Sequence, residues 1–238
     1  MAMNFDGVTT LTFDCYGTLI DWEAGILTAL RPLLARSGAR QDAAVLQDFA
    51  ACEARQQAET PDMLYAALLT AVHGELARRW GVAPDAQEDR AFGASIAAWP
   101  PFADTVAALT YLKQHFRLVV LSNVDRNSFA GTAKQLGVTF DAIYTAQDIG
   151  SYKPDIRNFE YLLQRLADVG TDRAHILHVA QSLFHDHAPA NAIGLRSVWI
   201  DRQAGSAGHG ATSAPPAGVR CDARYPTLGA LAEAHRAG

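Results

Sequence analysis

The chain has 238 residues, of which 49% are hydrophobic and 19% are charged, as is typical of a globular protein with one large domain or a domain carrying an insertion. The net charge of −5 provides no basic surface for nucleic acid or a membrane, and no apolar run reaches membrane-spanning length. The three cysteines (Cys15, Cys52 and Cys221) are too widely spaced to indicate a disulfide framework or a zinc site. Without the features of a signal peptide at the N-terminus, we expect a cytoplasmic protein.

The first predicted element is a short buried strand. It covers residues 9–14, in which the short apolar run from Leu11 to Phe13 ends in a carboxylate and is followed by a Gly-Thr turn. Asp14 is therefore expected at the carboxyl end of a strand, where open α/β sheets bind ligands. Residues 22–97 contain few glycines and have apolar side chains at helical spacing. We predict a helical insertion that ends at the Trp-Pro-Pro-Phe sequence of residues 99–102, because consecutive prolines break a helix.

Helices and strands are expected to alternate through the rest of the chain. The apolar patterns predict helices at 103–115, 128–136, 156–168, from 187 onward and at 227–236, and strands at 118–121, 142–144, 176–179 and 197–200. Such alternation implies a parallel sheet covered on both faces, and residues 203–218 are expected to form a Gly/Ala/Ser/Pro-rich loop. The predicted fold class is α/β, with a doubly wound, Rossmann-like core (residues 1–21 and 98–238) and an inserted helical cap domain (22–97).

The sequence Leu-Thr-Phe-Asp-Cys-Tyr-Gly-Thr-Leu-Ile-Asp at residues 11–21 resembles the first motif of the haloacid dehalogenase superfamily. The resemblance implies that Asp14 is a nucleophile that forms a covalent intermediate, and that Thr18 orients it. Phosphatases of the superfamily have a second aspartate two positions later, as general acid for an alkoxide. Here that position is Tyr16, as in the L-2-haloacid dehalogenases, and we expect it to contact the substrate. Because a departing halide needs no proton, such a site suits carbon–halogen cleavage better than phosphate-ester cleavage.

Two further segments match the second and third motifs of the superfamily. Ser122 and Asn123 directly follow a buried strand, and the resemblance implies that the serine binds the substrate anion while the asparagine holds the departing halide. Taken alone, either residue would also fit a helix cap. Ser-Tyr-Lys-Pro-Asp at residues 151–155 matches the third motif, in which Lys153 pairs with Asp14, keeps it ionised and neutralises charge in the transition state.

The fourth motif departs from the family pattern. The dehalogenases have Ser-x-Asn-x-x-Asp here, whereas this chain reads Val-Ala-Gln-Ser-Leu-Phe-His-Asp. Asp186 aligns with the family's acid only with one extra residue before it, and Ser182 or Gln181 would supply the polar contacts to Asp14 and the hydrolytic water. His185 is either a group that activates water or a structural residue. Phe159 is a second departure, because the family has a tyrosine six residues after the lysine of the third motif.

Within the predicted cap, Glu-Ala-Arg-Gln-Gln at residues 53–57 resembles the segment whose arginine grips the substrate carboxylate and halide. Arg55 is our candidate for this substrate-binding role, because a guanidinium offers a planar fork of donors that fits a carboxylate. A solvent-exposed helix arginine is the alternative. Trp22, Tyr65 and Trp99 near the hinge are candidates for the walls of an apolar pocket, or for ordinary packing.

The resemblance covers nearly the whole chain and implies a hydrolase similar to the L-2-haloacid dehalogenases. Asp14 would displace halide from a small 2-haloalkanoic acid, and water placed near Asp186 would hydrolyse the aspartyl ester. No metal or other cofactor is expected, the expected partner is a small anionic substrate, and both monomer and homodimer stay open. One alternative is a phosphohydrolase that binds Mg²⁺ through the same two aspartates. The other is a catalytically inactive domain that binds a small anion or another protein.

Overall fold

The computed structural model describes residues 3–204, 214 and 216–238. Within them lies a six-stranded sheet of order β3-β2-β1-β4-β5-β6, in which all neighbouring strands are parallel. The strands are β1 (Thr10–Phe13), β2 (Arg117–Ser122), β3 (Ala142–Thr145), β4 (Ile176–Ala180), β5 (Ser197–Ile200) and β6 (Ala223–Tyr225). Because β1 lies between β2 and β4, the chain winds outward in both directions from it, and the ends of these three strands form the crevice where such sheets bind ligands.

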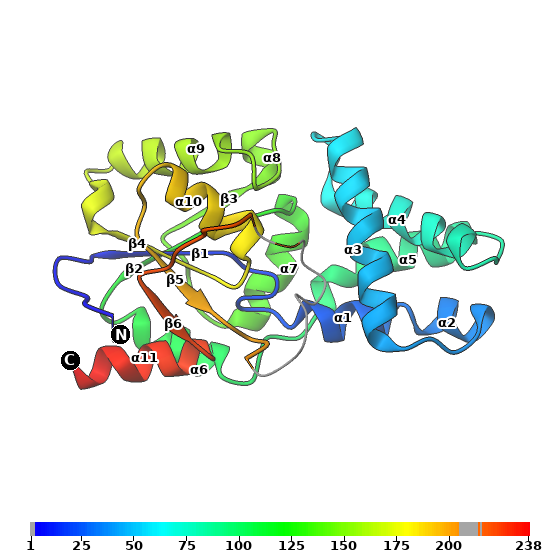
Figure 1. Cartoon of the computed structure of the whole chain (residues 1–238), viewed down its shortest axis with the longest axis horizontal. Helices are drawn as coiled ribbons and strands as arrows, with labels where there is room; N and C mark the ends of the chain where they lie inside the picture. The colour runs from blue at the N-terminus through cyan, green and yellow to red at the C-terminus, as the bar shows by residue number, and fades with distance from the viewer. Residues whose placement is uncertain (1–2, 205–213, 215) are drawn as a thin grey trace.

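Helices cover both faces of this sheet, with α8 and α9 along one face and α6 and α11 along the other (Figure 1). They are α6 (Thr105–Leu112), α7 (Arg126–Leu136), α8 (Ala146–Ile149), α9 (Arg157–Ala167), α10 (Ala188–Ala192) and α11 (Leu228–Ala237). The side chains of β2 alternate between two hydrophobic clusters: Val119 and Leu121 pack with Phe159 of α9, whereas Leu118 and Val120 belong to the cluster on the opposite face. The predicted doubly wound α/β class is confirmed.

The segment between β1 and α6, predicted as a helical insertion, is helical, and we call its helices the cap helices. They are α1 (Trp22–Ala29), α2 (Arg31–Ser37), α3 (Asp42–Glu59), α4 (Tyr65–Arg79) and α5 (Ala86–Ser95), followed by the 3₁₀ turn η1 (Ile96–Ala98). Figure 1 shows them grouped beside the sheet. The two connecting segments run side by side, because the Asp21 N–H donates to the Pro100 carbonyl (2.8 Å) and the Phe102 N–H donates to the Leu19 carbonyl (3.1 Å).

One carboxylate joins the cap helices to the helices of the sheet. Asp125 caps α7 by accepting from the N–H of Ser128 (2.9 Å), and its other oxygen accepts from the N–H of Ala66 in the first turn of α4 (3.1 Å). Nearby, the Tyr152 hydroxyl donates to the Met63 carbonyl (2.5 Å). The position of α4 over the sheet edge is therefore fixed by hydrogen bonds as well as by apolar packing.

The structure differs from the predicted elements in a few places. The short elements α8 and β6 were not predicted, and the helix expected from residue 187 begins earlier, as the π-helical turn η3 (Leu183–His187), before continuing as α10. Of the loop predicted at 203–218, residues 205–213 and 215 lie outside the described residues. No helix in the described part of the chain is long and apolar enough to cross a membrane.

Candidate active site

Asp14 lies immediately beyond β1 and is held on both sides. Its backbone N–H donates to the Val179 carbonyl of β4 (3.1 Å), which continues the sheet pairing by one residue. The turn that follows contains Gly17 at a φ of +90°, a conformation that favours glycine. This turn returns Thr18 to the carboxylate, where its Oγ1 donates to Asp14 Oδ2 (2.6 Å) and accepts from the N–H of Gln181 (2.9 Å). The backbone donor fixes the direction of the threonine proton toward Asp14.

The ammonium of Lys153 joins the site together. It is 1% exposed, and its Nζ donates to Asp14 Oδ1 (2.9 Å), Asp186 Oδ1 (2.6 Å) and the Leu121 carbonyl (3.0 Å). Burial by itself lowers the pKa of Lys153, but the two carboxylates raise it above its ordinary value. The lysine is therefore charged, and all three of its N–H donors are used.

The two aspartates beside this ammonium differ in basicity. Burial raises the pKa of Asp14 above its ordinary value, against the opposing effect of Lys153. Burial also acts to raise the pKa of Asp186, but Lys153 and His178 together hold it well below the ordinary range. Asp14 is thus the more basic of the two carboxylates, and Asp186 is the fixed counter-ion.

The π-helical turn η3 explains how Asp186 reaches the site despite the extra residue in its motif. The Ser182 carbonyl accepts from the N–H of Asp186 (3.1 Å) and also from that of His187, five residues on (3.3 Å). A π-turn holds one residue more than an α-turn and is often found at functional sites. Ser182 Oγ caps the turn by accepting from the N–H of His185 (2.9 Å). The insertion is therefore absorbed locally, and the acid keeps its contact with Lys153.

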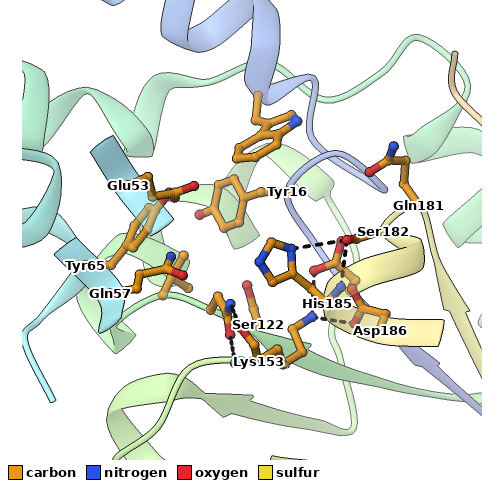
Figure 2. Close-up of a pocket in the computed structure, with 14 residues that line it drawn as sticks. Tyr16, Glu53, Gln57, Tyr65, Ser122, Lys153, Gln181, Ser182, His185 and Asp186 are labelled. Atoms are coloured by element: carbon orange, nitrogen blue, oxygen red, sulfur yellow. Dashed lines mark hydrogen bonds and ion pairs between the residues drawn. The ribbon is translucent and has the colours of Figure 1, made fainter. Parts of the chain in front are cut away.

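His185 also lines the pocket. Its Nδ1 lies 3.1 Å from Ser182 Oγ, and burial lowers the pKa of the imidazole to about 4. The ring is therefore neutral at neutral pH. Figure 2 shows it between Ser182 and the centre of the pocket.

A buried histidine that the sequence analysis did not single out supports Asp186 from behind. His178 on β4 is paired in register with Thr12 on β1. Its ring nitrogens lie 2.8 Å from Thr12 Oγ1 and 3.0 Å from Asp186 Oδ1. The ring of Phe159, which stands where the family has a tyrosine, packs edge-on against this imidazole (5.2 Å between centroids). The sequence did offer one signal for His178, since it is the one histidine in an otherwise apolar strand.

Ser122 and Asn123, at the end of β2, differ in their availability to a ligand. Ser122 Oγ is buried and has no hydrogen-bond partner among the described residues. The Asn123 side chain is engaged with the backbone of Lys153, accepting from its N–H (2.6 Å) and donating to its carbonyl (3.0 Å). Ser122 can therefore serve a bound molecule, while Asn123 positions the lysine.

The site opens into a small pocket, in which about 40 Å³ is accessible to the centre of a water molecule. The lining residues are Asp14, Tyr16, Trp22, Glu53, Gln57, Tyr65, Ser122, Asn123, Val124, Lys153, Gln181, Ser182, His185 and Asp186 (Figure 2). Tyr16 bonds to Thr132 Oγ1 through its hydroxyl (2.7 Å) and packs edge-on against Trp99 (5.8 Å between centroids). Of the aromatic residues predicted near the hinge, Trp22 and Tyr65 reach the pocket, whereas Trp99 supports it.

The structure does not bring Arg55 to this pocket, contrary to the sequence-based expectation. Its side chain is 52% exposed and forms an ion pair with Glu75 of α4 (2.9 Å). The reason is the helical period: Glu53 and Gln57, one turn apart on α3, both face the pocket, and a residue midway between them points away. Glu53, which was not predicted as a site residue, takes the place on the cap side.

The site offers few ligands for a metal ion. Asp186 Oδ2 is buried without a hydrogen-bond partner among the described residues, and such an oxygen suits Mg²⁺. However, both Asp14 and Asp186 already give an oxygen to Lys153. Among the described residues, no three His, Cys, Asp or Glu side chains are grouped to hold a metal. A cation here would take its remaining ligands from water and substrate.

The fold and this strand-end site are those of a hydrolase with a Rossmann-like core. The family model described as haloacid dehalogenase-like hydrolase matches residues 8–186, and the chain belongs to this family. No curated protein sequence matches the chain.

Several solved structures share the whole fold. The defluorinating L-2-haloacid dehalogenase Rha0230 has a TM-score of 0.79 at 23% identity, covering 99% of this chain and 100% of its own. The L-2-haloacid dehalogenase of Xanthobacter autotrophicus with covalently bound chloropropionic acid has a TM-score of 0.77 at 17% identity, covering 96% and 98%. The magnesium-bound putative HAD-hydrolase YfnB of Bacillus subtilis has a TM-score of 0.72 at 17% identity, covering 93% and 95%. At these identities the likeness concerns the fold.

Proposed function

We propose that the protein hydrolyses the carbon–halogen bond of a small 2-haloalkanoic acid through an aspartyl-ester intermediate. Two features of the pocket carry the proposal. Asp14 is buried and hydrogen-bonded, and a tyrosine, Tyr16, stands where the phosphatases have their general acid. Burial raises the pKa of Tyr16 well above its ordinary value, so the leaving group meets a neutral phenol. The covalently bound chloropropionic acid of the Xanthobacter autotrophicus enzyme supports this choice by likeness of fold.

In the first step Asp14 attacks the carbon that bears the halogen. A C–O bond forms as the carbon–halogen bond breaks, and the halide leaves with the bonding pair. Thr18 and Lys153 each hold one carboxylate oxygen, which orients the nucleophile and reduces the entropy lost on reaching the transition state. The free hydroxyl of Ser122 donates to the substrate carboxylate.

In the second step water attacks the ester carbonyl carbon of Asp14. The bond between that carbonyl and the product oxygen breaks, which releases a 2-hydroxy acid and restores the carboxylate. Asp186 Oδ2, an acceptor without a protein partner among the described residues, holds the water. The neutral imidazole of His185 lines the same pocket and accepts one proton of the water, while the other proton goes to the departing alkoxide oxygen of the product.

A magnesium-dependent phosphohydrolase is the second candidate, and the same unpartnered oxygen of Asp186 favours it. In that case Asp14 and Asp186 would hold the ion, which would neutralise charge on the transferred phosphoryl group. The tyrosine at position 16 argues against it, because an alkoxide leaving group then lacks its acid. An inactive binding domain is less favoured still, since a site without chemistry has no use for a buried charge cluster.

The deciding experiment measures halide release from 2-chloropropionate and phosphate release from p-nitrophenyl phosphate on the same preparation, with and without EDTA. We expect halide release that is unchanged by chelation. Phosphate release that disappears with EDTA and returns with Mg²⁺ would replace this proposal with the phosphohydrolase. If a folded preparation released neither halide nor phosphate, the result would favour the inactive domain.

A further inference from the structure

The charges around the pocket fit poorly with a substrate that is only an anion. Among the lining residues, all of which are described, Lys153 is the one cation, because His185 is neutral. All three donors of that ammonium are already used by Asp14, Asp186 and the Leu121 carbonyl. Among these described lining residues the substrate therefore meets no available cation, and a further acidic group faces it from the cap helices.

That group is Glu53 on α3, which lies across the pocket from Lys153 and Asp186 (Figure 2). Its side chain belongs to a residue only 6% exposed, and one carboxyl oxygen accepts the hydroxyl proton of Tyr65. Among the described residues, the one hydrogen bond found for this side chain is that to Tyr65, and the other oxygen is not one of the fully buried unpartnered atoms, so it is open to the pocket that the residue lines. Burial raises the pKa of Glu53 to about 7, with the Tyr65 bond acting in the opposite direction. Near neutral pH the group is therefore only partly ionised, and its ionised form can only accept hydrogen bonds.

The second oxygen of Glu53 loses contact with water when a substrate fills the pocket, and that loss is costly unless a donor on the substrate replaces the water. A buried polar group without a partner loses its hydration and gains nothing in return. Tyr65 satisfies one oxygen of Glu53, and Gln57, one helical turn along α3, borders the same space. A methyl group placed against Glu53 would leave the second oxygen unpaired, whereas an O–H or N–H group would pair it.

We propose that Glu53 recognises a hydrogen-bond donor on the substrate, so that the preferred substrate is a 2-haloalkanoic acid whose third carbon carries a hydroxyl or ammonium group. This inference rests on the proposed function for its chemistry. Ser122 takes the carboxylate end and Glu53 the donor end, with the reacting carbon between them over Asp14. A site built to hydrogen-bond a substrate group discriminates strongly against the analogue that lacks it.

The test compares kcat/KM for halide release from 2-chloropropionate, 2-chloro-3-hydroxypropionate and 2-chloro-3-aminopropionate. We expect at least one donor-bearing compound to exceed 2-chloropropionate by about tenfold or more. In Glu53→Gln the carbonyl can still accept from Tyr65, while the amide presents a donor, so the preference should fall to about one or below. Glu59→Gln is the matched control: it makes the same substitution on the same helix, at a residue that is exposed and outside the pocket. It should leave the preference unchanged.

The inference would be overturned if 2-chloropropionate reacted as well as or better than both donor-bearing compounds, or if Glu53→Gln kept the preference for a donor-bearing compound. Halide release in either case would still support the proposed function. If none of the three compounds releases halide, the proposed function fails instead. Calorimetric binding of glycerate and lactate to the wild-type protein then tests the recognition by itself. Tighter binding of glycerate that is lost in Glu53→Gln supports the role of Glu53, and equal affinities contradict it.

Discussion

Two of the buried carboxyl groups that line the pocket, Asp186 and Glu53, have pKa values shifted in opposite directions. Asp186 accepts from Lys153 and His178, and its pKa lies well below the ordinary range. Glu53 accepts from the phenol of Tyr65, and its pKa rises to about 7. Desolvation acts in the same direction on both, so the difference comes from Lys153 and His178, which lower the pKa of Asp186 and have no counterpart beside Glu53. The sheet side of the pocket, with Lys153 and Asp186, thus holds charged groups, whereas the cap side, with Glu53 and Tyr65, favours uncharged hydrogen-bonding groups.

The comparison assigns the chemistry to the sheet side, and Asp14→Asn tests this most severely. We expect turnover to fall by about a thousandfold or more, because a neutral amide is a poor nucleophile. The fold should survive, since the amide can still accept from Thr18. The measurement is halide release together with single-turnover hydrolysis in heavy-oxygen water, which should place label in the Asp14 carboxylate of the wild-type protein. Label found only in the product, or an active Asp14→Asn free of deamidation, would refute the covalent mechanism.

Removing the Lys153 ammonium should leave two buried carboxylates without their counter-ion and so destabilise the fold. Lys153→Met leaves Asp14 and Asp186 without their shared ammonium, and we expect the free energy of unfolding to fall by about 3–5 kcal/mol. Lys113→Met removes a partly exposed ion pair with Asp141 (2.6 Å) and should cost about 1 kcal/mol or less. Chemical denaturation of both variants measures the difference. Equal losses in the two would show that the central ammonium is no more important than a surface one.

The two sides should also differ in how acid affects stability. His187 is fully buried, with its ring nitrogens near Ser197 Oγ (2.9 Å) and the Ala180 carbonyl (3.0 Å), and burial lowers its pKa to about 4. Between about 4 and its ordinary value of 6.5, the unfolded chain binds more protons, so this stability is present above that window and is lost as the pH falls. Glu53 titrates the other way: its raised pKa means that stability is gained as the pH falls below 7.

Denaturation of the wild type, His187→Gln and Glu53→Gln at pH 7 and pH 5 separates these effects. Relative to the wild type, we expect acidification to favour His187→Gln by about 2 kcal/mol and to disfavour Glu53→Gln by about 2 kcal/mol. Parallel pH profiles for all three proteins would mean that neither group is perturbed.

The smallest effect is expected from the cap arginine that the sequence analysis favoured. Arg55→Lys alters an exposed side chain that pairs with Glu75, and it should change kcat/KM by less than about threefold, since such pairs contribute little. A loss near a hundredfold would mean that α3 presents a different face to the substrate during turnover.

Much of this arrangement could be predicted because it depends on strand ends. Apolar runs locate β1, β2 and β4, and a parallel sheet then brings Asp14, Ser122 and Asp186 to one edge whatever the details of the loops. The face that α3 turns to the pocket was not predictable from a short motif, since residues two apart lie on opposite sides of a helix and a two-residue error in alignment exchanges Arg55 for Glu53. His178 was missed because strand patterns show burial but not what a buried polar group bonds to. The strand β6 is too short and polar for its pattern to be recognised.

The contact between Asp125 and α4 has a consequence for how the chain unfolds. A single buried carboxylate caps α7 and also accepts from the first turn of α4. If the cap helices melted alone, this carboxylate would lose a donor, and α7 would lose part of what orders its start. The free energies of opening the two regions are therefore linked, and hydrogen exchange should report them as one cooperative unit instead of two independent ones.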